Sequence, residues 1–189
     1  MRIAIFGGTF DPIHNAHLIA AREAARQFSL DKVLFVPAAC PPHKKSSVEN
    51  FQHRFKMVEI ACAGDPILTA SPLEAGPEIS YSIRTIENVR ATLQPQDWLS
   101  FIIGADAFAE ITTWYKWETV VQLVDFIVIS RPGHEYAVPP GARVHRLDSL
   151  DLFTSSSAIR RQLAQGGEPA EIPQAVLAYI RGYGLYRQA

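Results

Sequence analysis

Two histidines, His14 and His17, are the first residues of the chain whose types and spacing suggest chemistry. A helix that begins near Asn15, a residue suited to cap it, would project both imidazole rings to the same side of its first turn. The pair closely follows Gly7-Gly8, and glycines let backbone amides approach a phosphate. Two imidazoles beside a phosphate cradle suit a reaction that builds negative charge on phosphorus.

The elements around this pair favour that interpretation. An isolated pair would more often be a helix cap and a surface residue, because short motifs match by chance. Here residues 3–6 form an apolar run of strand length, the glycine pair ends it, and residues 18–28 carry an apolar helical stripe. Strand, glycine turn and helix form the opening unit of a parallel α/β sheet, which binds ligands at the carboxyl ends of its strands.

Three later segments bring polar residues to comparable positions. Residues 32–36 form a second buried strand, and the proline-rich loop after it carries Lys44. Residues 98–103 form the most hydrophobic strand, which runs into Gly104 and Asp106. Ser156 and Arg160 open a helix, where hydroxyls, bare amides and a guanidinium can hold a phosphate. The alternatives are a solvated lysine, an aspartate that caps a helix, and a serine-rich cap beside a solvated arginine.

An aromatic cluster, Trp114-Tyr115-Lys116-Trp117, follows the Gly104 turn. Aromatic residues this dense lie more often in the core than on a ligand platform. Trp114, however, falls between two predicted helices, where a flat ring can face a pocket. We therefore interpret Trp114 as a stacking platform and Trp117 as a packing residue.

The rest of the chain continues an alternating pattern. Three more helices are predicted. One covers residues 50–63, one begins at Ser82 as its N-cap, and the last begins at residues 172–173 in the C-terminal region. Further strands are predicted at residues 67–70, 125–130 and 144–147, and residues 73–79 are predicted to be extended and partly irregular.

Composition limits the function classes. The 189 residues carry a net charge of −1, with 48% hydrophobic and 20% charged residues, as expected for one globular domain over residues 1–189. That balance argues against bulk nucleic-acid binding. No run reaches membrane-spanning length, and the apolar residues before Gly7 are too few for a signal peptide. Cys40 and Cys62 lack metal-site spacing, and we expect neither a disulfide nor a location outside the cytoplasm.

The motifs together resemble a known family. Residues 7–18, Gly-Gly-Thr-Phe-Asp-Pro-Ile-His-Asn-Ala-His-Leu, are similar to the signature of the paired-histidine nucleotidyltransferases, and most of all to the bacterial nicotinate mononucleotide adenylyltransferases. The Pro-Pro-His-Lys run at 41–44, Ser-Tyr-Ser-Ile-Arg-Thr at 80–85 and the serine-rich start of the 154–160 helix resemble further family motifs. Ala16 replaces a usual glycine and Arg84 a usual aspartate. The resemblance extends from residue 3 to residue 186.

The resemblance implies a fold and a reaction. The fold is an open, doubly wound, mainly parallel α/β sheet in three layers, the Rossmann-like nucleotidyltransferase fold. The reaction is adenylyl transfer from ATP to nicotinate mononucleotide, which gives deamido-NAD and pyrophosphate in NAD biosynthesis. Mg²⁺ would be held mainly by the ATP phosphates, because the sequence lacks a carboxylate cluster, and no protein metal site is expected. No nucleic acid or membrane partner is implied, and the oligomeric state is left open.

The family's functional residues match positions of this sequence. Catalytic roles are implied for His14, His17 and Arg160. ATP binding is implied for Gly8, Thr9, Phe10, His17, Gly104, Asp106, Ser155, Ser156 and Arg160. Mononucleotide binding is implied for Lys44, Thr85, Trp114 and Tyr115.

Two other functions compete with this one. Another adenylyl- or cytidylyltransferase of the superfamily, such as one that acts on phosphopantetheine, would share the histidines. A linear pantetheine arm, however, offers no ring to stack on Trp114. A nucleotide-binding sensor without turnover is the rival from a different class, and the presence of both histidines and Arg160 weighs against it.

Overall fold

A six-stranded sheet forms the centre of the computed structural model, which describes residues 1–41, 49–130, 135–147 and 154–187. Within these residues the strand order is β3-β2-β1-β4-β5-β6, and every neighbouring pair is parallel. The strands are β1 (Arg2–Gly8), β2 (Lys32–Pro37), β3 (Leu68–Ala70), β4 (Trp98–Gly104), β5 (Asp125–Ile129) and β6 (Arg143–Leu147). The chain starts at β1 and winds outward in both directions, which confirms the predicted doubly wound topology and makes it wholly parallel here.

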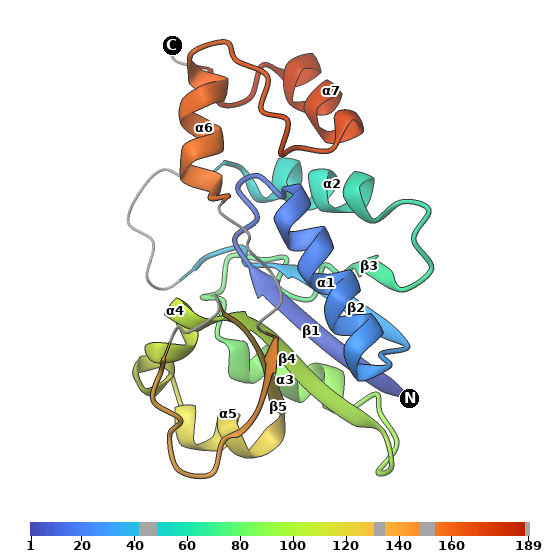
Figure 1. Cartoon of the computed structure of the whole chain (residues 1–189), viewed down its shortest axis with the longest axis vertical. Coiled ribbons are helices and arrows are strands. Elements are labelled where there is room, and N and C mark those ends of the chain that lie inside the picture. The colour runs from blue at the N-terminus through green and yellow to red at the C-terminus, as the bar shows by residue number, and fades with distance from the viewer. Residues whose placement is uncertain (42–48, 131–134, 148–153, 188–189) are drawn as a thin grey trace.

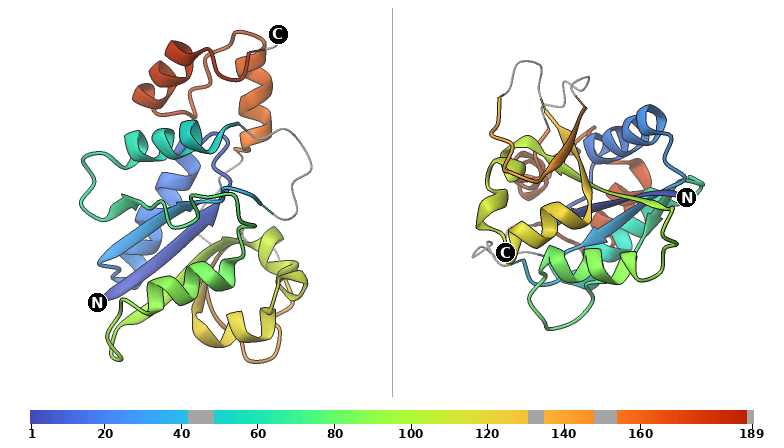
Figure 2. Two further views of the ribbon diagram at one scale, coloured as in Figure 1. Left: turned by 180° about the vertical axis from the view of Figure 1, so that it is seen from behind. Right: turned by 90° about the horizontal axis from the view of Figure 1, so that it is seen from below.

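Helices cover both faces of this sheet. They are α1 (Asn15–Phe28), α2 (Phe51–Cys62), α3 (Ser82–Arg90), α4 (Ala105–Ala109), α5 (Trp117–Leu123), α6 (Ser156–Ala164) and α7 (Gln174–Tyr183), with a 3₁₀ turn η1 (Ile111–Thr113) before α5. Figure 1 shows α1 in front of the sheet, and the view from behind in Figure 2 brings α3 to the front. The helices α6 and α7 lie beyond α2, toward the C-terminal end of the molecule (Figure 1). The architecture therefore has the three predicted layers.

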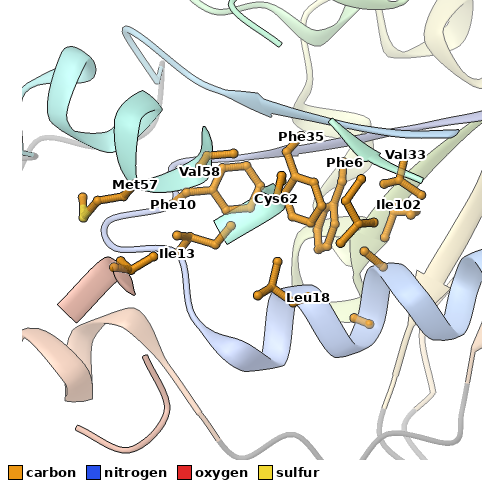
Figure 3. Packing of buried hydrophobic residues seen from close by; sticks show 14 of the residues in the cluster. Phe6, Phe10, Ile13, Leu18, Val33, Phe35, Met57, Val58, Cys62 and Ile102 are labelled. Atoms are coloured by element: carbon orange, nitrogen blue, oxygen red, sulfur yellow. The ribbon is translucent and has the colours of Figure 1, made fainter. Parts of the chain in front are cut away.

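The two faces of the sheet carry separate hydrophobic cores, because successive side chains of a strand point to opposite faces. In β1, Ala4 and Phe6 join α1, α2, α6 and α7 in the first core, while Ile3 and Ile5 join α3 and α5 in the second. Figure 3 shows part of the first core, where Phe6, Phe35 and Phe10 pack between the strands and α1. A near-continuous apolar run such as residues 3–6 is what a strand buried on both faces requires.

Several element boundaries differ from the sequence prediction. The N-cap of α1 is His14, one residue before the predicted Asn15. Asn15 is taken by a tertiary contact instead: its backbone N–H donates to Glu171 O at 2.7 Å, and its side chain donates to Ala170 O at 3.2 Å. The segment before α7 therefore sets where α1 begins, which no local pattern could indicate.

Two further helix caps lie one and two residues before the positions considered from the sequence. Tyr81 occupies the N-cap position of α3, so that Ser82 is its first residue and not its cap. Gly104 occupies the N-cap position of α4, and Asp106 lies in the first turn. The segment between β3 and α3 has no regular structure, as predicted.

Candidate functional site

Two cavities open at the carboxyl ends of the central strands. One, which we call the histidine cavity, has a volume of about 600 Å³ and is lined by His14, His17, Asp106 and Ser156 among others. The other, which we call the aromatic cavity, has a volume of about 560 Å³ and is lined by Trp114 and its neighbours. Gly7 and Gly104 line both cavities. The ends of β1 and β4 therefore form the boundary at which the two cavities meet.

The two histidines lie together at the start of α1, as their spacing predicted. Their rings stack with centroids 3.7 Å apart and planes inclined by 25°. His17 Nδ1 accepts a hydrogen bond of 3.3 Å from the backbone N–H of His14. Phe6 and Phe10 each pack against the His17 ring in an edge arrangement. The pair is thus fixed by the helix terminus on one side and by aromatic rings on the other.

Both imidazoles are neutral at physiological pH. Burial lowers the pKa of His14 to about 4. Burial also lowers the pKa of His17 well below its ordinary value, and the neighbouring His14 adds to this effect. Because His17 Nδ1 is a hydrogen-bond acceptor, the ring proton is on Nε2, which can donate to a ligand. His14 Nδ1 is buried and has no hydrogen-bond partner within the described part of the chain. A buried polar atom without a partner at a cavity wall is suited to bind a ligand.

The glycine pair at the end of β1 has a packing reason in addition to any role toward a ligand. A Cβ atom on Gly7 would lie 2.8 Å from Cζ of Phe101, and one on Gly8 would lie 2.9 Å from Cζ of Phe10. Both distances are too short for real side chains, so only glycine allows these rings to approach the strand. The side chain of Phe10 is itself buried in the first core. Gly8 and Thr9 line the aromatic cavity.

The start of α6 borders the histidine cavity through Thr154, Ser155 and Ser156. Ser155 caps the helix, because its Oγ accepts from the backbone N–H of Ala158 at 3.2 Å. Ser156 Oγ donates to Pro12 O at 3.2 Å. Ser155, Ser156, Asp106 and the two histidines therefore surround one cavity, and the helix terminus adds a positive dipole end.

Arg160 is not among the residues that line either cavity. Its Nη1 donates to Asp11 O at 2.7 Å and lies 3.6 Å from Asp11 Oδ2. Asp11 is only 2% exposed, and its Oδ1 accepts from the Tyr186 hydroxyl at 2.8 Å. The arginine of the predicted phosphate clamp is thus bonded to the main-chain carbonyl of Asp11, with the Asp11 carboxyl group close by.

A second arginine, Arg54, was missed by the sequence analysis. It is 1% exposed and donates to Thr9 O at 2.6 Å and to Glu49 O at 2.8 Å. These bonds tie the loop after β1 to the start of α2. An arginine on an amphipathic helix is usually solvated, so no pattern in the sequence singles Arg54 out.

The aromatic cavity contains the predicted stacking residue. Trp114 follows η1 and packs its edge against Phe101 with ring centroids 5.8 Å apart. Tyr115 is exposed, and its ring lies 4.6 Å from that of Tyr81. Both Trp114 and Tyr115 line the cavity and Trp117 does not, while both tryptophans also pack against the second core. The stacking role of Trp114 stays a prediction.

The remaining mononucleotide residues are placed differently from one another. Thr85 is 2% exposed and is not part of the aromatic cavity lining; its hydroxyl donates to Glu74 Oε1 at 2.5 Å. Glu74, which the sequence analysis did not single out, does line that cavity. Arg84 is more than half exposed and pairs with Glu78. Lys44 lies outside the described residues.

No group of three or more histidine, cysteine, aspartate or glutamate side chains among the described residues could hold a metal ion. No helix in the same part of the chain is long and apolar enough to cross a membrane.

Comparison with known sequences identifies relatives along the whole chain. Residues 5–162 match the family model described as cytidylyltransferase-like. A protein of Solibacter usitatus described as "Probable nicotinate-nucleotide adenylyltransferase" is 56% identical over 98% of this chain and 100% of its own length. A Thermus thermophilus protein with the same description is 42% identical over 99% of this chain and 100% of its own length.

Comparison with solved structures supports the fold. A Plasmodium falciparum nicotinic acid mononucleotide adenylyltransferase, complexed with NaAD, aligns with a TM-score of 0.79 at 24% identity. The alignment covers 98% of this chain and 97% of the other. A Vibrio parahaemolyticus structure described as a nicotinate-nucleotide adenylyltransferase aligns with a TM-score of 0.70 at 22% identity over 100% and 96% of the two chains.

Proposed function

The chain belongs to the nicotinate-nucleotide adenylyltransferase family of cytidylyltransferase-like proteins, and on this premise we propose that it transfers the adenylyl group of ATP to nicotinate mononucleotide. The products are deamido-NAD and pyrophosphate. One observation carries the proposal beyond the family: a cavity lined by His14 and His17 meets a cavity lined by Trp114 at the ends of β1 and β4. A transfer between two nucleotides needs two such compartments that share a boundary.

The chemistry makes modest demands on the protein. The 5′-phosphate of the mononucleotide has a second pKa of about 6, so it is largely a dianion at neutral pH and needs no strong base. Its oxygen attacks the α-phosphorus of ATP, a new P–O bond forms, and the bond to the departing pyrophosphate breaks. The protein must align the two phosphates and reduce the charge that develops between them.

The histidine pair suits this task. His17 in its neutral form carries its proton on Nε2 and can donate a hydrogen bond from there. Because the ring has no net charge, it does not attract a phosphate dianion in the ground state as a cation would. Such a donor stabilises charge that grows in the transition state more than charge already present in the ground state. His14 would act beside it through its buried ring nitrogen Nδ1.

The other assigned residues would hold the substrates. ATP, which brings Mg²⁺ with it on its phosphates, would bind along the histidine cavity, with Gly104 and Asp106 near the ribose and Ser155 and Ser156 near the terminal phosphates. Arg160 would join them by exchanging Asp11 for a phosphate. Trp114 and Tyr115 would face the pyridine ring, with Lys44 toward the phosphate and the start of α3 near Thr85 toward the ring substituent. A cytoplasmic location remains a prediction from the sequence.

The test is pyrophosphate release from MgATP by the purified chain in the presence of single acceptors. The acceptors are nicotinate mononucleotide, nicotinamide mononucleotide and phosphopantetheine, with a reaction lacking acceptor as the blank. We expect release only with the mononucleotides, faster with the nicotinate form. Turnover of phosphopantetheine alone would assign the chain to another branch of the superfamily. ATP binding without release by any acceptor would indicate a sensor.

A further inference from the structure

The aromatic cavity has an unexpected charge. Glu74 and Glu110 are the charged residues among the described residues that line it. Nicotinate mononucleotide, the ligand proposed for this cavity, is negative at its phosphate and at its ring carboxylate. A carboxylate that meets another carboxylate in a partly enclosed site is destabilised unless one of them is neutral or well hydrogen-bonded.

The two glutamates differ in their surroundings. Glu110 is exposed, follows α4 and faces solvent, so water screens its charge. Glu74 is half-buried between the aromatic cavity and a smaller one of about 300 Å³. Its Oε1 accepts from the Thr85 hydroxyl at 2.5 Å, and the Ser80 side chain also bonds to the carboxyl group. Thus Glu74 is fixed against the first turn of α3, the helix start expected to face the ring substituent.

We propose that Glu74 is a specificity-determining residue, whose carboxyl group favours nicotinate mononucleotide when it is neutral and favours nicotinamide mononucleotide when it is ionised. This inference rests on the proposed function, and it concerns how that function selects its acceptor. A neutral carboxyl group can donate its proton to a ring carboxylate. An ionised one repels that carboxylate but accepts a hydrogen bond from the NH₂ group of a carboxamide.

The burial of Glu74 favours the protonated form of its carboxyl group, so that the group loses its proton at a higher pH than an exposed glutamate does. Burial raises the pKa of Glu74, and the hydrogen bonds from Thr85 and Ser80 offset part of that rise. The charged and titratable groups around it are Tyr81 at the N-cap of α3, Arg84 within α3, Glu78 of its own segment, and Glu110 and Tyr115 of the aromatic cavity. Arg84 is already paired with Glu78, so it does not neutralise Glu74. The thiol of Cys40 lies beside the same segment, against the carbonyls of Gly76 and Pro77.

The experiment measures kcat/KM for both mononucleotides as a function of pH and follows their ratio. The two acceptors share the phosphate, ATP and the histidine pair, so the ionisation of those groups cancels in the ratio. Because an ionised Glu74 opposes the acid, the wild-type preference for nicotinate should fall as pH rises through the pKa of Glu74. The expected fall is about tenfold, the coupling that corresponds to a shift of one pKa unit.

Two substitutions, one on each side of the hydrogen bond between Glu74 and Thr85, sharpen the test. Glu74→Gln keeps an oxygen that accepts from Thr85 but cannot ionise, so its ratio should be independent of pH and about tenfold higher than that of the wild type at the alkaline end. Thr85→Val removes a donor that favours the ionised carboxylate, so the fall in the ratio should move to higher pH. A merely structural role of Glu74 would change KM for both mononucleotides equally and leave the ratio untouched.

Glu87→Gln is the matched control. It removes one negative charge from α3, the helix that carries Thr85, but Glu87 is exposed and lines neither the aromatic cavity nor the smaller one. Its ratio should follow the wild-type curve within about twofold. A wild-type ratio that does not change with pH, or a Glu87→Gln effect as large as that of Glu74→Gln, would overturn the inference while the proposed function stands. Failure of the wild type to use either mononucleotide would overturn the proposed function itself.

Discussion

The histidine cavity and the aromatic cavity share an edge at Gly7 and Gly104 but are built in different ways. The first is formed by helix starts: His14 and His17 open α1, Ala105 and Asp106 open α4, and Ser155 and Ser156 open α6. The second takes its distinctive side chains from irregular segments, among them Glu74 before α3 and Trp114 and Tyr115 between η1 and α5. Helix starts offer fixed amides and a positive dipole end that any phosphate can use. Irregular segments offer side chains shaped to one ligand.

This difference assigns distinct duties to the two cavities. We expect substitutions in the histidine cavity to affect the rate of transfer and the binding of ATP, whichever mononucleotide is offered. We expect substitutions in the aromatic cavity to affect the affinity for the acceptor and the choice between acceptors. Each prediction below tests that division.

The largest effect is expected from His17→Ala. The Nε2–H of His17 is a donor whose value rises as charge develops, and the loss of one such donor typically lowers kcat by about 10²–10³. ATP affinity should change far less, because a neutral imidazole contributes little to binding a charged ground state. Steady-state turnover and ATP titration, measured separately, give the two numbers. His17→Gln, which keeps an N–H near the same place, should recover part of the rate; near-normal turnover of His17→Ala would remove this histidine from the mechanism.

A smaller effect is expected from Trp114→Ala. Stacking of a ring on an aromatic side chain contributes about 1–3 kcal/mol, so KM for the mononucleotide should rise by about one to two powers of ten. The KM for ATP should remain close to that of the wild type. Trp114→Phe should recover much of the loss, because it keeps a ring face.

Trp117→Ala is the control for that prediction, since Trp117 packs against the second core and lies off the cavity. It should lower the thermal unfolding midpoint without a specific effect on the acceptor. Stacking cannot distinguish a carboxylate from a carboxamide of nearly the same shape. The preference for nicotinate should therefore persist in Trp114→Ala, and its disappearance would transfer the selectivity from the Glu74 region to the ring.

The two cavities also differ in how far they could be predicted from the sequence. His14 and His17 lie at one recognisable helix start and Ser155 and Ser156 at another, so spacing alone brings each pair together, whereas the fold brings the two pairs to one cavity. Trp114 was identified by its place between two elements. The parallel sheet followed from the apolar runs at residues 3–6, 32–36 and 98–103, each of which is a strand.

The contacts that fix these residues could not be predicted, because they join distant parts of the chain. Asp11 and Tyr186 are 175 residues apart, and Arg54 is 45 residues from Thr9. Neither pair has a periodic or local signal. Glu74 lies in an irregular segment where no pattern assigns a direction to a side chain. The sequence predicts the groups that can react, whereas the fold determines which of them are buried, paired or turned away.

Arg160→Ala tests the predicted phosphate clamp, whose arginine the structure places outside the lining of the histidine cavity. Arg160 is bonded to Asp11, so a phosphate must compete with an existing partner for the guanidinium. The loss in ATP affinity should therefore be only about tenfold, the lower part of the range for a hydrogen bond to a charged group. Mononucleotide affinity should stay near the wild-type value. Arg161→Ala removes an exposed arginine from the next position of α6 and serves as the control. Equal losses of affinity for ATP and for the mononucleotide would show that the assignment of Arg160 to ATP is wrong.

The smallest effect is expected from Tyr186→Phe, which leaves Arg160 intact and alters only what supports it. The Tyr186 hydroxyl donates to Asp11 Oδ1 at 2.8 Å, and the Asp11 side chain is 3% exposed. Besides this hydroxyl, the described hydrogen bond to Oδ1 is a longer one, from the Glu49 N–H at 3.3 Å. Removing the hydroxyl leaves a buried carboxyl oxygen poorly satisfied, which should lower the free energy of unfolding by about 1–3 kcal/mol.

Asp11 in Tyr186→Phe should also attract Arg160 more strongly, because its carboxyl group loses the hydroxyl donor and the Arg160 guanidinium lies 3.6 Å from Oδ2. The KM for ATP should consequently rise by about threefold, with kcat and the mononucleotide KM unchanged. A threefold change is only a fraction of the free energy of one hydrogen bond to a charged group, because Arg160 itself is still present. Chemical denaturation and steady-state kinetics measure the two effects on the same preparation. Tyr183→Phe, which removes an exposed hydroxyl from α7, should change neither. A loss of stability without any change in ATP binding would mean that Asp11 supports the fold of the β1 loop but does not compete with the nucleotide for Arg160.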